Sequence, residues 1–252
     1  MPVYAAFTFV LGLVVGSFLN VVAYRLPRHE SIAFPPSHCP DCGARLRPAD
    51  LVPVLSYLRL RGRCRYCAKP ISPRYPLVEL TTGALFLLVY IARGPGWGLV
   101  PGFVLSALMA AVAAIDLDHR IIPNPLTFTG VLTGVAFAVL GWSGIGFLQA
   151  VLGILVCGGF LLVVGLIGRG GMGGGDVKLG AAIGAFLGWG AGLFGILLGF
   201  VGGAVVGLGL IAARIKGRKD AIPFGPFLAL GAVISYLWGK PAIAAYLRLW
   251  TR

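Results

Sequence analysis

The chain has 252 residues, of which 58% are hydrophobic and only 12% are charged. Soluble domains average about 25% charged residues, so this composition excludes an ordinary soluble globular protein. The net charge of +13 would suit a nucleic acid ligand, but ten of the 21 Lys and Arg lie between Arg25 and Arg74, in the only long polar stretch. Such clustering is typical of the cytoplasmic loops of membrane proteins, so we expect a lipid bilayer and no nucleic acid as partner.

Apolar runs of about 20 residues, the length that crosses a bilayer, recur along the chain. They predict an all-α polytopic membrane bundle of about eight transmembrane helices, because a β-barrel would show alternating segments of about 10 residues. The first run lacks the basic start and the cleavage site of a signal peptide, so we interpret it as a helix. The expected helices cover residues 4–24, 76–92, 98–116, 125–141, 146–167, 176–188, 191–213 and 223–238.

The polar segment 25–75, inserted between the first two expected helices, carries two C-x₂-C pairs. They are formed by Cys39 with Cys42 and by Cys64 with Cys67. Each pair can form a turn that directs two thiolates at one metal ion, and their spacing is close to that of a Cys₄ zinc site. We therefore expect a small domain stabilised by structural Zn²⁺, since four thiolates leave no ligand position for a substrate.

Glu79 enters the bilayer on the second expected helix. An isolated glutamate in a membrane helix needs either a hydrogen-bond partner or a function. The sequence leaves both interpretations open, and it makes Glu79 a candidate for binding substrate.

Two aspartates stand at the ends of apolar runs. Asp116 closes the run 98–116, and Asp176 follows a loop rich in glycine, residues 168–175, which we call the glycine loop. Two carboxylates that meet in a poorly hydrated site share a proton, which supplies a general base for water and a general acid for a leaving amine. The pair therefore indicates aspartic peptide hydrolysis. Helix capping is the structural alternative.

Two other functional classes fit the same features. Broken helices with carboxylates and glycine-rich interruptions also form the sites of ion-coupled transporters. A membrane scaffold whose zinc domain binds a partner would need neither aspartate.

The distribution of basic residues predicts the topology. Eight helices place both termini on one side, and the segments 25–75, 116–124, 168–175 and 214–222 on the other. The latter group carries most of the Lys and Arg, so the positive-inside rule places it in the cytoplasm and both termini outside. The candidate aspartates then lie at the cytoplasmic end of the bundle.

Taken together, these motifs resemble the bacterial type IV prepilin peptidases, which are bifunctional leader peptidases and N-methyltransferases of the type IV pilus and type II secretion systems. The matching stretches cover most of the chain in order. They are residues 16–22, 25–27, 35–42, 64–67, 70–79, 116, 122–124 and 173–178.

The resemblance implies a GxGD-type intramembrane aspartyl protease of the bacterial inner membrane. The GxGD motif falls on residues 173–176, and the first catalytic aspartate stands seven residues before Pro123, which selects Asp116 over Asp118. The implied activity is cleavage of prepilin and pseudopilin leaders after a glycine at the cytoplasmic face. N-methylation of the new N-terminal residue by S-adenosylmethionine follows.

The resemblance also implies which part of the chain carries which function. Residues 1–24 would form the first transmembrane helix, 25–75 the Cys₄ zinc-binding domain linked to methylation, and 76–252 the membrane-embedded peptidase core. Expected substrate-binding residues are Gly173 and Gly175, where the loop lets a strand approach Asp176, together with Lys178 and Glu79. Lys178 would alternatively contact lipid headgroups.

Overall fold

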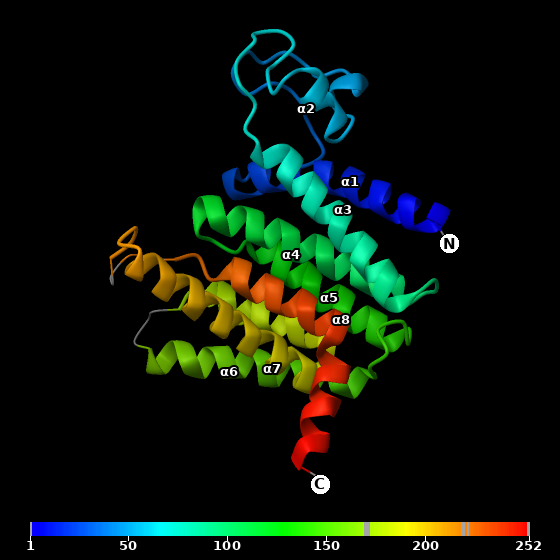
Figure 1. Ribbon diagram of the computed structural model, residues 1–252, viewed down its shortest axis with the longest axis vertical. Coiled ribbons are helices and arrows are strands. Elements are labelled where there is room, and N and C mark those ends of the chain that lie inside the picture. Colours follow the sequence, from blue (N-terminus) through cyan, green and yellow to red (C-terminus); the bar gives the residue numbers. More distant parts are fainter. Residues whose placement is uncertain (1, 169–171, 218–219, 221, 251–252) are drawn as a thin grey trace. The chain divides into compact units, whose positions relative to one another are not determined.

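The computed structural model describes residues 2–168, 172–217, 220 and 222–250 (Figure 1). Within these ranges every long element is a helix, and the extended pairing is confined to two isolated bridges. The predicted all-α fold is therefore confirmed. The chain divides into two compact units, Met1–Gly94 and Pro95–Arg252.

The first unit is organised on two apolar helices, α1 (Pro2–Arg25) and α3 (Arg74–Arg93). Glycines at their contact let the backbones approach: a Cβ on Gly12 would lie 2.7 Å from the Cα of Gly83. Small residues serve the same purpose where membrane helices pack closely in general. The segment between the two helices contains only short helices, η1 (Leu26–Arg28), η2 (Pro48–Asp50) and α2 (Leu55–Arg59).

The two cysteine pairs of this segment lie on turns of the same construction. In the first turn the N–H of Cys39 donates to the carbonyl of Ala44, and in the second the N–H of Cys64 donates to Lys69. Each turn needs a left-handed residue one position after its second cysteine, and Gly43 (φ 69°) and Ala68 (φ 58°) fill these positions. The C-x₂-C spacing thus produces two matching, thiol-bearing turns.

In the residues that the structure describes, the second unit contains five helices. They are α4 (Leu99–His119), α5 (Asn124–Val139), α6 (Phe147–Ile167), α7 (Gly174–Ala212) and α8 (Gly225–Trp250). Among the described residues of the whole chain, six helices are long and apolar enough to cross a membrane, while α5 is apolar but shorter.

Helix α7 is two helices joined by a sharp turn. Gly188 has non-helical angles (φ 75°, ψ 176°), and a Cβ on Gly192 would lie 3.3 Å from the Cα of Gly184. Residues eight apart on a straight helix would be separated by about 12 Å, so the chain folds back on itself at Gly188. This confirms the predicted separate segments 176–188 and 191–213, and the described part of the chain then has eight apolar helical segments.

The last helix is longer than the sequence analysis expected. The last expected helix ended at residue 238, whereas α8 continues through Pro241 to Trp250. The residues after Pro241 are mostly good helix formers such as Ala and Leu. A proline removes one hydrogen bond and bends a helix without having to end it.

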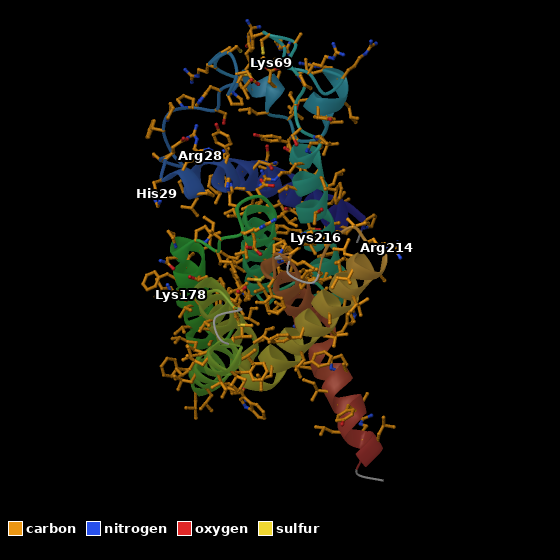
Figure 2. The ribbon with its side chains drawn as sticks, turned by 90° about the vertical axis from the view of Figure 1, so that its left-hand side faces the viewer. Arg28, His29, Lys69, Lys178, Arg214 and Lys216 are labelled. Atoms are coloured by element: carbon orange, nitrogen blue, oxygen red, sulfur yellow. The ribbon has the colours of Figure 1, made fainter. Side chains whose placement is uncertain are left out.

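One end of the second unit gathers the predicted functional segments. Helices α4 and α6 end there, and α5, α7 and α8 begin there (Figure 1). Figure 2 looks toward this end, where the labelled side chains of Lys178, Arg214 and Lys216 lie. Three of the four segments expected on one membrane face, 116–124, 168–175 and 214–222, therefore border this end through their described residues, whereas the fourth, 25–75, belongs to the first unit.

We predict that Gly153→Ala destabilises the second unit, because its Cβ would collide with the backbone of Gly184 on α7. Such overpacking costs about 1–3 kcal/mol. The measurement is the thermal unfolding midpoint of purified protein in detergent. The matched control is Gly159→Ala on the same helix, where a Cβ meets no atom within 4 Å among the described residues. Equal midpoints for the two variants would contradict the prediction.

Candidate active site and metal centre

Asp116 lies in the last turn of α4 and is buried, with 5% of its surface exposed. The backbone N–H of Gly225, at the start of α8, donates to its Oδ2 at 2.8 Å. Helix α4 ends three residues later, and Arg120 then takes a left-handed conformation whose N–H caps the carbonyl of Asp116. Asp116 is thus held by a neighbour 109 positions along the chain.

Asp176 stands in the first turn of α7 and is half-buried. Its Oδ2 accepts a hydrogen bond from the N–H of Gly173 at 3.1 Å, so the carboxylate caps its own helix. It also lies close enough to Asp116 for the two carboxylates to interact electrostatically. The structure therefore places the two predicted aspartates within electrostatic range of each other, whereas Asp118 is exposed.

The glycines beside the pair stand where a side chain would not fit. A Cβ on Gly175 would lie 2.9 Å from the Cβ of Ile122, and one on Gly225 would lie 2.8 Å from Oδ2 of Asp116. These glycines permit the close approach of three chain segments. Gly225 was missed in the sequence analysis, and its only local signal is the Gly-Pro step that begins α8.

The nearby Lys178 is engaged within the protein. Its Nζ donates to Oδ1 of Asn124 at 2.8 Å, although the side chain is otherwise exposed. This bond ties the start of α7 to the start of α5, next to the aspartates. It supplies a structural role that the sequence analysis did not consider.

A cavity of about 350 Å³ adjoins Asp176. Its walls are mostly apolar, and sequence reasoning identified none of the aromatic residues among them. The lining residues are Met172, Asp176, Phe200, Gly203, Ala204, Ile222, Pro223, Phe224 and Phe227. A carboxylate at the edge of an apolar cavity can act on a bond in an apolar chain that enters it.

The four predicted cysteines form one cluster in the first unit. Their Sγ atoms all lie within 4.8 Å of one another, and those of Cys39 and Cys67 are 3.9 Å apart. Thiolates around tetrahedral Zn²⁺ lie about 3.8 Å apart, so the cluster fits this ion. Hydrogen bonds from the backbone N–H groups of Cys67 and Tyr66 lower the pKa of Cys64 to about 7, which favours the thiolate that a metal needs.

Glu79, by contrast, belongs to the first unit. It is buried, with 7% of its surface exposed. The N–H of Val54 donates to its Oε2 at 2.7 Å, and Ser17 forms a second hydrogen bond with it. The carboxylate thus links the start of α3 to α1 and to the zinc-domain loop.

Comparison with known proteins gives consistent matches along the chain. The bacterial peptidase A24 N-terminal domain matches residues 10–93, and the type IV leader peptidase family matches residues 103–208. The chain is 39% identical to the prepilin leader peptidase/N-methyltransferase of Aeromonas hydrophila, over 97% of this chain and 94% of that protein. The protein of the same name from Bacillus subtilis (strain 168) is 38% identical, over 96% and 97%. No solved structure shows a significant match.

Each family match therefore lies within one of the two compact units, and Asp116 and Asp176 both fall inside the second match. The similarity extends over nearly the full length of both relatives. From these matches and this site, the chain belongs to the type IV leader peptidase family.

Proposed function

We propose that this protein cleaves the leader of type IV prepilins and pseudopilins at the cytoplasmic membrane face, after a glycine. It then methylates the new N-terminal residue with S-adenosylmethionine. The observation that carries the peptidase proposal is the pairing of Asp116 with Asp176 beside an apolar cavity. The family membership and the names of the similar proteins support both activities.

The two carboxylates would divide the work of hydrolysis. A pair that shares one proton offers a base that activates water and an acid that protonates the leaving amine. Asp116 is fixed by the N–H of Gly225, and Asp176 by that of Gly173. The substrate strand would approach Asp176 along the loop at Gly173 and Gly175, where Ile122 packs on one side of Gly175, and Lys178 would lie close to this path.

We assign the metal centre to structural Zn²⁺ held by Cys39, Cys42, Cys64 and Cys67, because four thiolates at tetrahedral spacing suit this ion. When bound, the ion would hold the two cysteine turns together and leave no position for a substrate. Functionally, we place the zinc-binding domain in residues 25–75 and the peptidase in residues 76–252. The border at 76 lies inside the first packing unit, because α3 packs on α1.

The proposed topology puts the zinc-binding domain and the aspartates in the cytoplasm, and both termini outside. Its support is the gathering of basic side chains such as Lys178, Arg214 and Lys216 at the end of the second unit that carries the aspartates (Figure 2). The location would be the bacterial inner membrane.

The decisive experiment incubates purified protein with a synthetic prepilin, with and without S-adenosylmethionine, and reads intact mass. Loss of the leader, with an added methyl group only when the donor is present, would establish both activities. Ion flux in proteoliposomes without cleavage would favour a transporter. Partner binding that survives loss of both aspartates, without cleavage, would favour a scaffold.

We predict that Asp116→Asn and Asp176→Asn each lower the rate of leader cleavage at least about 10³-fold, because the remaining carboxyl group cannot serve as both acid and base. The rate is measured from intact mass over time. Asp118→Asn is the matched control and should stay within a few-fold of the unchanged protein. A strong loss in Asp118→Asn with activity retained in Asp116→Asn would reassign the first catalytic position.

We predict that Gly225→Ala also impairs cleavage, by about 10-fold or more, because its Cβ would displace the carboxylate of Asp116. The control is Gly209→Ala on α7, where a Cβ meets no described atom within 4 Å. Unimpaired cleavage in Gly225→Ala would show that the contact with α8 does not position Asp116.

We predict that the purified protein carries one zinc ion per chain and that Cys64→Ser loses most of it, because a hydroxyl is a poor zinc ligand. Zinc is quantified by plasma mass spectrometry. Cys157→Ser is the control, since Cys157 is buried in α6 of the second unit and is not a member of the cluster. Equal zinc content in the two variants would refute the assignment.

A further inference from the structure

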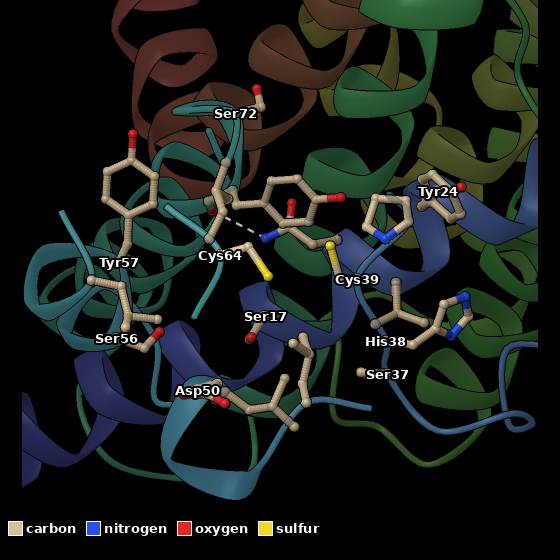
Figure 3. A pocket seen from close by; sticks show the side chains of 18 of the residues that line it. Ser17, Tyr24, Ser37, His38, Cys39, Asp50, Ser56, Tyr57, Cys64 and Ser72 are labelled. Carbon is tan, nitrogen blue, oxygen red and sulfur yellow. Dashed lines mark hydrogen bonds between the residues drawn. The ribbon is translucent and has the colours of Figure 1, made fainter. Parts of the chain in front are cut away.

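The first unit contains a second cavity, of about 410 Å³. It is enclosed by the C-terminal half of α1, both cysteine turns and the start of α3, and Figure 3 shows Ser17, Cys39 and Cys64 at its walls. Pockets for drug-sized ligands measure about 300–1,000 Å³. The proposed peptidase and structural zinc chemistry leave this cavity without a role.

Most of the charged groups in its walls are already engaged. Asp50 accepts a hydrogen bond from Nε of Arg65 at 2.8 Å, and this partner lowers the pKa of its carboxyl group. Asp41 accepts one from Nζ of Lys69, also at 2.8 Å. The guanidinium of Arg25 donates to backbone carbonyl groups at 2.9 and 2.7 Å. These groups build the walls and leave little net charge for a ligand.

Glu79 is different. Among the described residues, it is the one carboxylate lining this cavity that forms no ion pair. Its partners are the N–H of Val54 and the hydroxyl of Ser17, both neutral. Because a buried carboxylate is costly without an opposite charge, a cationic group that enters the cavity would be stabilised here.

The remaining walls suit a planar, cationic ligand. Three tyrosines, Tyr24, Tyr57 and Tyr75, line the cavity together with apolar side chains such as Val21 and Leu60. Aromatic walls accept planar heterocycles and attract cations. The hydroxyl groups of Ser17, Ser56 and Ser72 and the amide of Asn20 add hydrogen-bonding capacity.

We propose that this cavity is the methyl-transfer site, that it holds S-adenosylmethionine, and that Glu79 receives the α-ammonium group of the new N-terminal residue. The proposal rests on the methyltransferase half of the proposed function and assigns its location. It also gives the cysteine turns a second purpose, since Cys39 and Cys64 form part of the wall.

The chemistry balances with these groups. Glu79 takes one proton from the ammonium group, which leaves a neutral amine and a neutral carboxyl group. The amine nitrogen then forms a bond to the methyl carbon while the carbon–sulfur bond breaks. The electron pair of that bond stays on sulfur, and the thioether S-adenosylhomocysteine leaves.

Other titratable groups face the same space and bear on any pH profile. Besides the two ion pairs and Arg25, the lining includes His38, Tyr24, Tyr57, Tyr75, Cys39 and Cys64. His38 is engaged through Nδ1 with the carbonyl of Pro36 at 3.1 Å, and zinc would keep both thiols deprotonated. Among the described carboxylates in the walls, Glu79 is thus the one that no cation already binds, and we assign the amine proton to it.

The location is tested by binding, without turnover. Calorimetry of S-adenosylhomocysteine is carried out on the purified full chain and on Val21→Trp, whose larger side chain would fill the cavity. We expect Val21→Trp to weaken binding at least 10-fold while zinc content stays unchanged. The matched control is Val14→Trp on the exposed side of α1, which should bind as the unchanged protein does. Unweakened binding in Val21→Trp would overturn the location.

The role of Glu79 is tested with a synthetic peptide that already has a free N-terminal phenylalanine, so that no cleavage is needed. At pH 7 we expect Glu79→Gln to lower kcat for methylation about 100-fold or more, within the usual range for a lost general base. Its rate should then rise nearly 10-fold per pH unit up to pH ~8, as the free amine becomes available, more steeply than in the unchanged protein. Glu30→Gln, at an exposed position, is the control.

The outcomes separate this inference from the proposed function. A Glu79→Gln variant that methylates as fast as the unchanged protein, or that loses the same factor at every pH, would overturn the role of Glu79. An unchanged protein that cleaves prepilin but neither binds S-adenosylhomocysteine nor methylates the peptide would overturn the donor site and leave the peptidase proposal standing. Absence of cleavage alone would count against the peptidase proposal and leave this inference intact.

Discussion

Two carboxylates can meet in the second unit because glycine occupies the positions next to them. At Gly225 a methyl group would already touch Oδ2 of Asp116, and at Gly175 it would press on Ile122. Glycines also allow close packing in the bundle that carries the two aspartates. Helices α6 and α7 approach at Gly153 and Gly184, and α7 and α8 approach at Gly195 and Gly231. Close backbone contact thus extends from the body of the bundle to the end that carries Asp116 and Asp176.

Such packing has a consequence for the electrostatics of the pair. In a membrane bundle the burial of a carboxylate is tolerated where hydrogen-bond donors replace water. Here the donors are backbone N–H groups of glycines, namely Gly225 for Asp116 and Gly173 for Asp176. A glycine therefore does two things at each position: it lets the chain come close, and it offers an N–H without a side chain in the way.

Much of this arrangement could be predicted from local sequence. The length of the apolar runs predicted the helices, the Gly188-Trp189-Gly190 step predicted the reversal inside α7, and the C-x₂-C spacing predicted the thiol cluster. Contact between Asp116 and Asp176 could be expected because both stand at helix ends on one face. Each of these features depends on residues close in sequence or on a strong rule of membrane topology.

The parts that could not be predicted depend on contacts between distant segments. No local pattern indicates that the N–H of Gly225 would face Asp116, or that Val54 would hold Glu79 from 25 positions away. The last helix was expected to end at residue 238, and its continuation past Pro241 to Trp250 was missed, although a proline does not have to end a helix. Neither cavity could be predicted from the sequence for the same reason, because each is lined by several segments that meet only in the folded chain.

The two proposed activities make opposite demands on a carboxylate, and the molecule meets them with different surroundings. The proposed hydrolysis needs a carboxyl group that still carries a proton, and a second carboxylate nearby favours that state for Asp116 and Asp176. Methylation needs a carboxylate that carries no proton. The leaving amine acquires a proton during cleavage, and it must give one up before its nitrogen can attack a methyl group. Glu79 is held by two neutral donors, the N–H of Val54 and the hydroxyl of Ser17. A single site with a shared proton could not serve both steps equally well, which gives a physical reason for two separate acidic sites in one chain.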